Sequence, residues 1–364
     1  KSPMRKLNIN YSWLYDKIQE AYSLSSYYFG NGKSLLPLRY TLELTYRCNL
    51  NCSYCYVGKK NSKNELITQE WFNIIDQIPA FRLITLVGGE VLIRKDFKQI
   101  LEKCLDKGKV NIVTNATLLN DELIKTFVDK KLLLLSVSID GIGENHDRNR
   151  GHAGTFDKVV KNLEKLNQVK GNKKQPMLDI KTVVLDNNLD DLVEIYKLAD
   201  YFGADFFTPA FLKESDLQQN GNLRETFGEE FYKINYPIKP YFDMEHFQDV
   251  FRQIRDLSKK SKTVIRFYPK FNPDDLNQIK KFYTEAKIKK VQDIYDPCLY
   301  PWANVLITPE GDIYPCLSYK VGNVRDIPIK DVWNGEKFIE FRRNLKRNKM
   351  FTSCQGCCQL KVKY

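Results

Sequence analysis

The chain has 364 residues, 43% of them apolar and 13% aromatic, which is enough for one large α/β core and a smaller appended unit. Nine cysteines in a chain of this length are too sparse for a secreted disulfide scaffold. No apolar run reaches the length of a membrane span, and no signal peptide is visible at the start. The cysteines fall into two groups with Cys104 between them, and grouped thiols suit metal binding in a reducing cytosol, so we expect a cytoplasmic protein.

The net charge of +12 results from 57 basic and 45 acidic residues. A basic surface would suit an acidic peptide substrate, an acidic electron-donor protein or RNA, and a lysine-rich source organism would explain it without any partner. Charge alone does not choose among these explanations. No recognised RNA-binding module or arginine-rich stretch is present, so we expect no nucleic-acid partner.

Residues 1–38 are expected to form a mostly helical, aromatic extension, after which strand-like and helix-like segments alternate from Arg39 to Ala210. The predicted strands are short apolar runs at Tyr40–Thr45, Arg82–Val87, Lys109–Thr114, Leu132–Ile139, Leu178–Leu185 and Ala204–Thr208. The predicted helices are amphipathic stretches at Gln69–Ile78, Asp96–Lys107, Asp121–Lys130, Thr155–Asn167 and Leu189–Phe202.

Six strand–helix (βα) units predict a parallel sheet with helices on its outside. In such sheets the residues that carry out the chemistry lie on the loops after the strands. Beyond the sixth unit, Phe211–Tyr241 is polar and irregular and is expected to be an insertion near the mouth of the fold. Predicted helices at Glu245–Lys259 and Pro273–Lys287 flank a predicted strand at Thr263–Tyr268. The chain therefore divides into an N-terminal extension, a core, an insertion with linker helices, and a second cysteine-bearing unit, at residues 1–38, 39–210, 211–297 and 298–364.

The loop after the first predicted strand carries Cys48, Cys52 and Cys55 in the run TYRCNLNCSYCYVG. Thiolates are soft ligands for iron–sulfur clusters, and this compact spacing lets one loop hold a cluster on three sides. The next cysteine is Cys104, so one iron of a [4Fe–4S] cluster would stay open to another ligand. A zinc knuckle or an incomplete disulfide set is the alternative, but zinc sites usually combine paired C-x2-C halves.

This motif resembles that of the radical S-adenosylmethionine (radical SAM) superfamily, and Tyr54 fits the aromatic residue usual before its third cysteine. The resemblance implies an α/β fold with a partial (β/α)6 barrel of the TIM type. It also implies that the open iron binds the methionyl amine and carboxylate of S-adenosylmethionine. One electron from the cluster would then cleave this cosubstrate to a 5′-deoxyadenosyl radical that removes hydrogen from a substrate.

The same resemblance assigns cosubstrate contacts to polar residues and glycines that follow the second, third and fourth strands. Glycines permit close approach of a ligand to the backbone, and VGGE ends the second strand. Strand side chains alternate, so SVSIDG places Ser136, Ser138 and Asp140 on one face. A guanidinium group suits a planar carboxylate, and DRNRG supplies one. The expected contacts are Gly88, Gly89, Glu90, Asn115, Ser138, Asp140 and Arg150.

The second cysteine group flanks a predicted hairpin, NVLITPEGDIYP, and continues after an amphipathic helix. The spacing of its cysteines with Gly311, Gly322, Asn323 and Trp333 resembles the twitch domain, a shortened SPASM domain. This resemblance implies a small C-terminal hairpin-plus-helix domain with one auxiliary [4Fe–4S] cluster, giving two clusters in all. Zinc stays an alternative here. The expected ligands are Cys298, Cys316, Cys354 and Cys357.

Two cysteines are left over. Cys104 lies on a predicted helix that faces the sheet, and we expect it in the core. Three roles stay open for Cys358: a ligand in place of Cys357, a buried thiol, or a hydrogen-atom donor to a substrate radical.

The leading hypothesis from this resemblance is a maturase that cross-links, oxidises or epimerises a ribosomally made peptide. A flavodoxin- or ferredoxin-type protein would supply its electrons. The alternative is a small-molecule radical dehydrogenase or an enzyme of cofactor biosynthesis, which the single auxiliary cluster favours. A third hypothesis is a non-catalytic iron–sulfur module. This hypothesis does not explain why the motifs that resemble cosubstrate contacts are intact.

Overall fold

The computed structural model describes residues 11–55, 57, 64–212, 241–272, 275–279, 295–316, 319–351, 354, 357 and 359–361. Cys358, nearly all of the predicted insertion and most of the predicted helix Pro273–Lys287 lie outside these residues. No helix in the described part is both long enough and apolar enough to cross a membrane.

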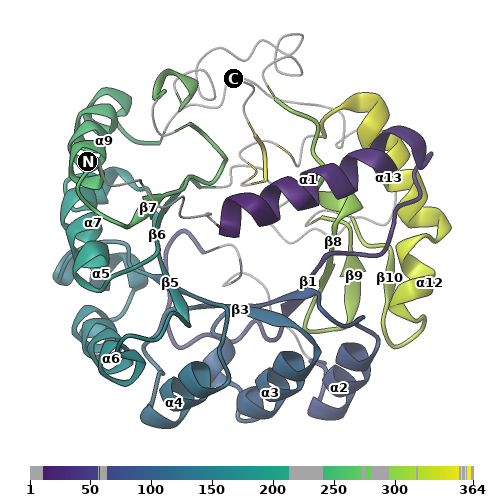
Figure 1. Cartoon of the computed structure of the whole chain (residues 1–364), viewed down its shortest axis with the longest axis horizontal. Coiled ribbons are helices and arrows are strands. Elements are labelled where there is room, and N and C mark those ends of the chain that lie inside the picture. The colour runs from purple at the N-terminus through teal and green to yellow at the C-terminus, as the bar shows by residue number, and fades with distance from the viewer. Residues whose placement is uncertain are drawn as a thin grey trace, which may run out of the picture.

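A ten-stranded sheet in the order β10-β9-β8-β1-β2-β3-β4-β5-β6-β7 organises the described chain (Figure 1). Strands β1 to β6 are parallel neighbours in chain order, which confirms the predicted α/β fold with a partial barrel. They span Arg39–Glu43, Leu83–Val87, Lys109–Thr114, Leu134–Ser138, Met177–Val183 and Phe206–Ala210.

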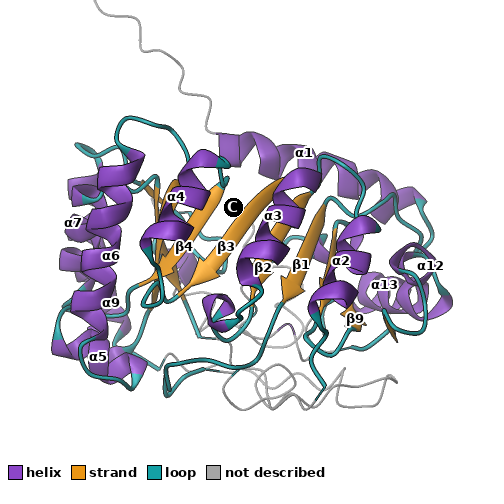
Figure 2. Cartoon of the chain, turned by 90° about the horizontal axis from the view of Figure 1, so that it is seen from below, coloured by secondary structure: helices purple, strands orange, loops and turns teal. Residues whose placement is uncertain are grey.

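Helices cover the outer face of this sheet, as the amphipathic segments predicted, and Figure 2 shows α2, α3 and α4 lying over strands β1 to β4. In α3, Phe97, Ile100, Leu101 and Cys104 recur on one face and are buried, so Cys104 belongs to the core. The covering helices are α2 (Thr68–Asp76), α3 (Phe97–Lys107), α4 (Asp121–Asp129), α6 (Thr155–Lys170), α7 (Leu192–Tyr201) and α9 (Met244–Ser258), whereas the short helix α5 (Glu144–Arg150) follows β4 and packs on α6. In the described residues, short 3-10 helices lie at Val91–Ile93, Asp186–Asn188 and Tyr300–Trp302.

The last strand of the barrel is shorter than predicted. Strand β7 covers only Val264–Ile265, whereas the sequence predicted Thr263–Tyr268. The chain nevertheless stays beside β6, because the backbone amides of Arg266 and Tyr268 donate to Phe207 and Pro209 at 2.9 and 3.1 Å.

The C-terminal hairpin continues the barrel sheet. Strand β8 (Asn304–Ile307) pairs in parallel with β1, and β9 (Asp312–Tyr314) and β10 (Gly322–Asn323) follow antiparallel. Thr41 of β1 donates to the Asn304 side chain of β8 at 3.0 Å. The second cysteine group is therefore attached directly beside the strand that leads into the first.

The N-terminal helix α1 (Tyr11–Phe29) and the loop after it pack on the C-terminal unit, beside α12 (Ile329–Trp333) and α13 (Glu336–Asn348) (Figure 1). Trp333 donates to the Leu35 carbonyl at 2.7 Å, and buried Arg342 donates to the Gly32 carbonyl at 3.0 Å. Residues far apart in the sequence thus hold the helices around the second cysteine group in place.

Candidate active site

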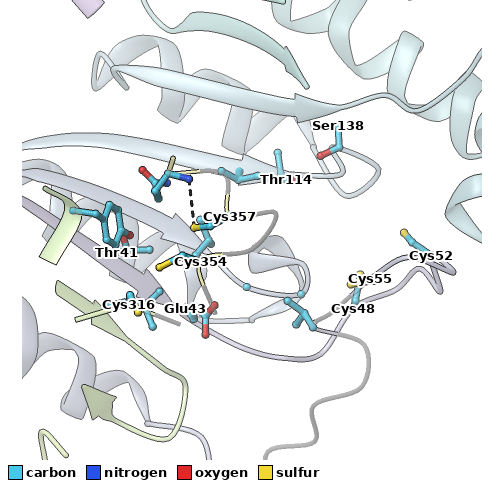
Figure 3. A pocket seen from close by; sticks show the side chains of 18 of the residues that line it. Thr41, Glu43, Cys48, Cys52, Cys55, Thr114, Ser138, Cys316, Cys354 and Cys357 are labelled. Atoms are coloured by element: carbon cyan, nitrogen blue, oxygen red, sulfur yellow. Dashed lines mark hydrogen bonds between the residues drawn. The ribbon is translucent and has the colours of Figure 1, made fainter. Parts of the chain in front are cut away.

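One cavity of about 360 Å3 lies between the two cysteine groups (Figure 3). Its lining includes every described cysteine except Cys104, namely Cys48, Cys52, Cys55, Cys298, Cys316, Cys354 and Cys357. Apolar side chains such as Val87, Leu306 and Phe351 fill much of the remaining lining. The two groups therefore face a shared, largely apolar space at the end of the parallel strands.

The cysteine loop is fixed to its surroundings by backbone contacts. The Cys55 amide donates to the Cys52 carbonyl at 3.1 Å, which closes a turn between two of the three thiols. The Asn51 amide donates to the Arg150 carbonyl at 3.1 Å and joins the loop to the end of α5. The loop therefore has a defined shape before any cluster is considered.

Gly88 and Gly89 line the cavity where β2 ends. A Cβ on Gly88 would lie 2.4 Å from the Thr45 carbonyl oxygen, and one on Gly89 would lie 2.3 Å from that of Arg47. The missing side chains therefore let β2 approach the base of the cysteine loop, in addition to leaving space for the ligand that the sequence predicts.

Glu90 follows these glycines but does not line the cavity. It is fully buried and accepts hydrogen bonds from the Thr114 hydroxyl and the Asn115 amide, both at 2.7 Å. Burial raises the pKa of Glu90. Its carboxyl group holds the residues after β3 in place, and its contact with the cosubstrate stays a prediction.

Asn115 lines the cavity next to the first cysteine. Its amide nitrogen donates to Asn49 at 3.0 Å and lies 3.9 Å from the Cys48 sulfur. Its amide oxygen accepts from both the backbone and the hydroxyl of Thr117. The side chain is thus held in one orientation against the cysteine loop.

Tyr54, Asp140 and Arg150 form a buried network. The Tyr54 hydroxyl donates to Asp140, and an Arg150 nitrogen lies 2.6 Å from the same carboxylate oxygen. Burial opposes the charge of Arg150, but Asp140, Tyr54 and Cys52 outweigh it and raise the pKa of its guanidinium group. Burial, and then the Asp140 charge, raise the pKa of Tyr54, so its phenol stays neutral. Neither Tyr54 nor Asp140 lines the cavity, whereas Arg150 does.

Arg150 also reaches the cysteine loop directly. A second guanidinium nitrogen lies 3.8 Å from the Cys52 sulfur, and its Nε, although buried, has no partner among the described residues. A buried donor without a partner is costly and indicates a ligand group that the protein itself does not supply. The predicted carboxylate of the cosubstrate fits this donor.

The two serines of β4 have different surroundings. Ser138, an expected cosubstrate contact, lines the cavity, whereas Ser136, which strand alternation places on the same face, donates to buried Asp179 at 2.9 Å. Burial alone would raise the pKa of Asp179, but Lys181, Arg266 and two hydroxyl donors lower it to about 2. Asp179, Lys181 and Arg266 thus form a charged cluster inside the barrel that the sequence did not indicate.

The thiols have the environment of cluster ligands. Burial raises the pKa values of Cys48, Cys52 and Cys354, so bound iron would be needed to keep them as thiolates. Backbone amides of Leu50, Phe351 and Gln359 donate to the sulfurs of Cys48, Cys354 and Cys357 at 3.4, 3.4 and 3.5 Å. All eight cysteines that the structure describes are free of disulfides. The cysteines that line the cavity therefore have the chemistry that iron–sulfur ligation requires.

Glu43 at the end of β1 is a cavity residue that the sequence analysis missed. It is 1% exposed, and it is the one carboxylate among the described residues that line the cavity. No described residue bonds to its Oε2 atom. Figure 3 draws its side chain between Cys316 and Cys48. An acidic residue in an otherwise apolar predicted strand was the signal that could have found it.

Comparisons with known proteins agree with this site. The family model for the radical SAM superfamily matches residues 42–199, and the SPASM model, an iron–sulfur cluster-binding domain, matches residues 298–358. The AdoMet-dependent heme synthase of Methanosarcina barkeri is 30% identical over 315 residues, 82% of this chain and 83% of that protein. The chain belongs to the radical SAM superfamily.

This radical SAM chain is similar to further proteins over part or most of its length. The sporulation killing factor maturation protein SkfB of Bacillus subtilis is 29% identical over 182 residues, 49% of this chain and 43% of that protein. SuiB of Streptococcus suis, solved with bound S-adenosylmethionine, has the same fold with a TM-score of 0.65. It is 17% identical, and the match covers 91% of this chain and 73% of that chain. The second cysteine group thus lies in an iron–sulfur cluster-binding domain, as predicted, rather than in a zinc site.

Proposed function

We propose that this radical SAM enzyme modifies a peptide by removing hydrogen from it inside the cavity shared by the two cysteine groups. The shared cavity is the observation that carries the proposal. A substrate held there would face the first group, which serves radical formation, and the second group, which can accept an electron. Both are needed for an oxidation or a cross-link.

The residues that would hold the bound groups are those that line the cavity. Cys48, Cys52 and Cys55 would hold one [4Fe–4S] cluster, and Cys298, Cys316, Cys354 and Cys357 a second one. S-adenosylmethionine would lie against Gly88, Gly89, Asn115, Ser138 and Arg150. When bound, the reduced cluster and this cosubstrate supply a 5′-deoxyadenosyl radical.

The protein's own side chains would control the fate of the substrate in the cavity. The apolar lining excludes water from the reacting groups. Arg150, fixed by Asp140, offers a permanent positive charge to a carboxylate, and Glu43 offers an unpaired carboxylate that can accept a proton from the substrate.

Three observations favour a peptide as substrate. SkfB, similar over about half of this chain, is named a maturation protein, and SuiB, of the same fold, has been solved with a precursor peptide. The net charge of +12 suits an acidic peptide. A small-molecule reaction of cofactor biosynthesis is the second candidate, because the heme synthase matches over 82% of this chain.

The test is anaerobic reconstitution and reduction, followed by incubation with any short peptide that the genome encodes beside this gene and by mass spectrometry of the peptide. A cross-link lowers the peptide mass by two hydrogens, and an oxidation changes the mass of the oxidised residue. Epimerisation leaves the mass unchanged in ordinary water but adds one deuterium in deuterated water. The variant Cys48→Ala/Cys52→Ala/Cys55→Ala is the matched control and should give none of these products. Formation of 5′-deoxyadenosine with an unmodified peptide would favour the small-molecule candidate. Absence of 5′-deoxyadenosine would leave only a non-catalytic module.

A further inference from the structure

The charged cluster inside the barrel lies beside the cavity. Its two cations are Lys181 of β5 and Arg266 just after β7, and each approaches the Asp179 Oδ2 atom, at 3.1 and 3.0 Å. None of the three is among the described residues that line the cavity. Ser138 of β4 does line it, and Ser138 is the register partner of Lys181. The cluster therefore borders the cavity, one strand away from its wall.

Asp179 is already fully occupied by groups of the protein. It is completely buried, and besides the two cations it accepts the hydroxyls of Ser136 and Thr208 at 2.9 and 2.5 Å. The side chains of Lys181 and Arg266 are 25% and 23% exposed. An ammonium group carries three donors and a guanidinium group five, so one carboxylate cannot occupy both cations. The two cations thus stay accessible to a further acceptor.

Aromatic rings hold the two cations in position. The Lys181 Nζ atom lies 4.7 Å from the centre of the Tyr268 ring, and the Arg266 guanidinium carbon lies 3.6 Å from the centre of the Phe206 ring. Cation–π contacts of this kind restrict long side chains that would otherwise sample many rotamers. A ligand that binds here would therefore meet two cations that are already oriented.

The ionisation of Tyr268 shows that the electrostatic potential in this part of the barrel is positive. Burial would raise the pKa of Tyr268, and Asp179 acts in the same direction. The charges of Lys181, Arg266 and Arg39 outweigh both effects and lower this pKa. A phenol loses its proton more readily where cations surround it, so the same place favours a bound anion.

The charge of the cluster indicates the class of anion. Two cations and one carboxylate leave a single positive charge in excess, which matches a monoanionic carboxylate better than a doubly charged phosphate. A guanidinium group also fits the planar carboxylate geometry. A peptide supplies such a group from an acidic side chain or from its C-terminal end.

We propose that Lys181 and Arg266 form an anion subsite beside the cavity that binds a carboxylate of the substrate. The proposal rests on the proposed function, because it assigns an acidic group to the peptide held in the cavity. The bound carboxylate would anchor the substrate on the side of β5 to β7, while the cysteine groups lie beside β1 and β8 (Figure 1). No covalent bond changes in this step.

The test measures binding of small probes to the reconstituted enzyme by ligand-observed NMR titration. The probes are N-acetylglutamate α-methylamide, its uncharged counterpart N-acetylglutamine methylamide, and N-acetylalanine, which represents a chain end. The wild type should bind a carboxylate probe at least about fivefold more tightly than the uncharged probe. Which carboxylate probe binds more tightly identifies the source of the group. Lys181→Met should reduce the preference to within about twofold.

Two further variants separate ligand binding from a structural role of the cluster. Lys197→Met is the control, because Lys197 pairs with Glu194 at 2.7 Å on the outer helix α7 and should keep the wild-type preference. Asp179→Asn removes the anion that competes for both cations and should tighten binding of the carboxylate probe at least about threefold. This variant decides the question if Lys181→Met does not fold.

Equal binding of charged and uncharged probes by the wild type would overturn the proposal. Unchanged or weaker binding of the carboxylate probes by folded Asp179→Asn would also overturn it, because the cluster would then serve only the barrel wall. A clear preference for a carboxylate probe in an enzyme that forms 5′-deoxyadenosine but modifies no peptide would support the subsite and contradict the peptide substrate of the proposed function.

Discussion

At the scale of single residues, Glu43 combines features that rarely occur together. It is 1% exposed, lies in a cavity that contains many apolar side chains, and its Oε2 has no described partner. Burying an unpaired carboxylate costs several kcal/mol, so such a group is retained where it has a task. We propose that Glu43 binds a donor group of the substrate or takes up a proton from it.

Replacing Glu43 with Gln should therefore separate stability from activity. We expect Glu43→Gln to unfold at the same or a higher temperature than the wild type, because Gln has nearly the same volume and no described residue bonds to Glu43 Oε2. Product formation should fall by at least about 100-fold while 5′-deoxyadenosine still forms. Thermal unfolding and quantified product measure the two effects. A clear loss of thermal stability with unchanged product would contradict this role.

The buried ring of His146 leads to a prediction about how protein stability depends on pH. Burial, and then the charge of Arg150, lower the pKa of His146 to about 3, although Asp147 opposes the shift. Its Nδ1 accepts a hydrogen bond from the Asp140 amide at 3.1 Å, which requires the neutral ring. Because the folded pKa is below the unfolded value of about 6.5, the unfolded state binds the proton first. Stability from this residue is thus present above about pH 6.5 and is lost as the pH falls toward 3.

Replacing His146 with Gln should reduce the slope of the unfolding free energy against pH by at most about 1.4 kcal/mol per pH unit below pH 6.5. The measurement is urea unfolding of wild type and variant at pH 7 and pH 5.5. His152→Gln is the control, because it makes the same substitution at an exposed histidine. An identical pH slope for His146→Gln and the wild type would show that burial does not depress this pKa.

At the scale of elements, the turn after α5 determines the position of the cysteine loop. Gly151 and Gly154 both have positive φ angles, of 67° and 74°. A Cβ on Gly151 would lie 2.3 Å from the Asn51 carbonyl oxygen, whereas one on Gly154 would have nothing within 4 Å. The two glycines therefore bear the same backbone strain but differ in contact with the loop.

Gly151→Ala should consequently displace Asn51 and weaken cluster binding at the first site, while Gly154→Ala should cost only about 1 kcal/mol of stability. Iron content and visible absorption after reconstitution distinguish the two variants. Full iron in Gly151→Ala would show that the loop adjusts without losing its ligand geometry.

The elements also show what local sequence can and cannot predict. Strands β1 to β6 were predicted to within a few residues, because buried parallel strands are continuous apolar runs between amphipathic helices. The pairing of β8 with β1 could not be predicted, since Thr41 and Asn304 are 263 residues apart and no local pattern links them. The same limit hid the shared cavity and the position of Glu43 within it.

The site residues also differ in how far the sequence could predict their positions. Strand alternation predicted only that Ser136, Ser138 and Asp140 share one face, and of these three Ser138 alone lines the cavity. Asp140 follows the end of β4, where alternation no longer applies, and it pairs with Tyr54 and Arg150. Tyr54 comes from the cysteine loop, Asp140 from the segment after β4 and Arg150 from the end of α5, so the tertiary structure sets this network and spacing alone could not assign it.

At the scale of the whole molecule, two cysteine groups on different elements contribute to one cavity. The first lies on the loop after β1, and the second combines the β8–β9 hairpin with residues after α13. Among the described residues, the framework that they share is the β1–β8 pairing and the surrounding core. Removing the ligands of one group should therefore leave the other group able to bind its cluster.

Iron content tests this independence. Reconstituted wild-type protein should contain about eight irons, and Cys48→Ala/Cys52→Ala/Cys55→Ala should lose about four of them. The complementary variant, with Cys298, Cys316, Cys354 and Cys357 replaced by Ala, should keep about four and still cleave S-adenosylmethionine, because the first group alone serves that step. A wild-type count near four would remove the second cluster. Loss of all iron in either variant would mean that the two sites fold as one unit. Electron transfer across the cavity would then require both cysteine groups to be intact.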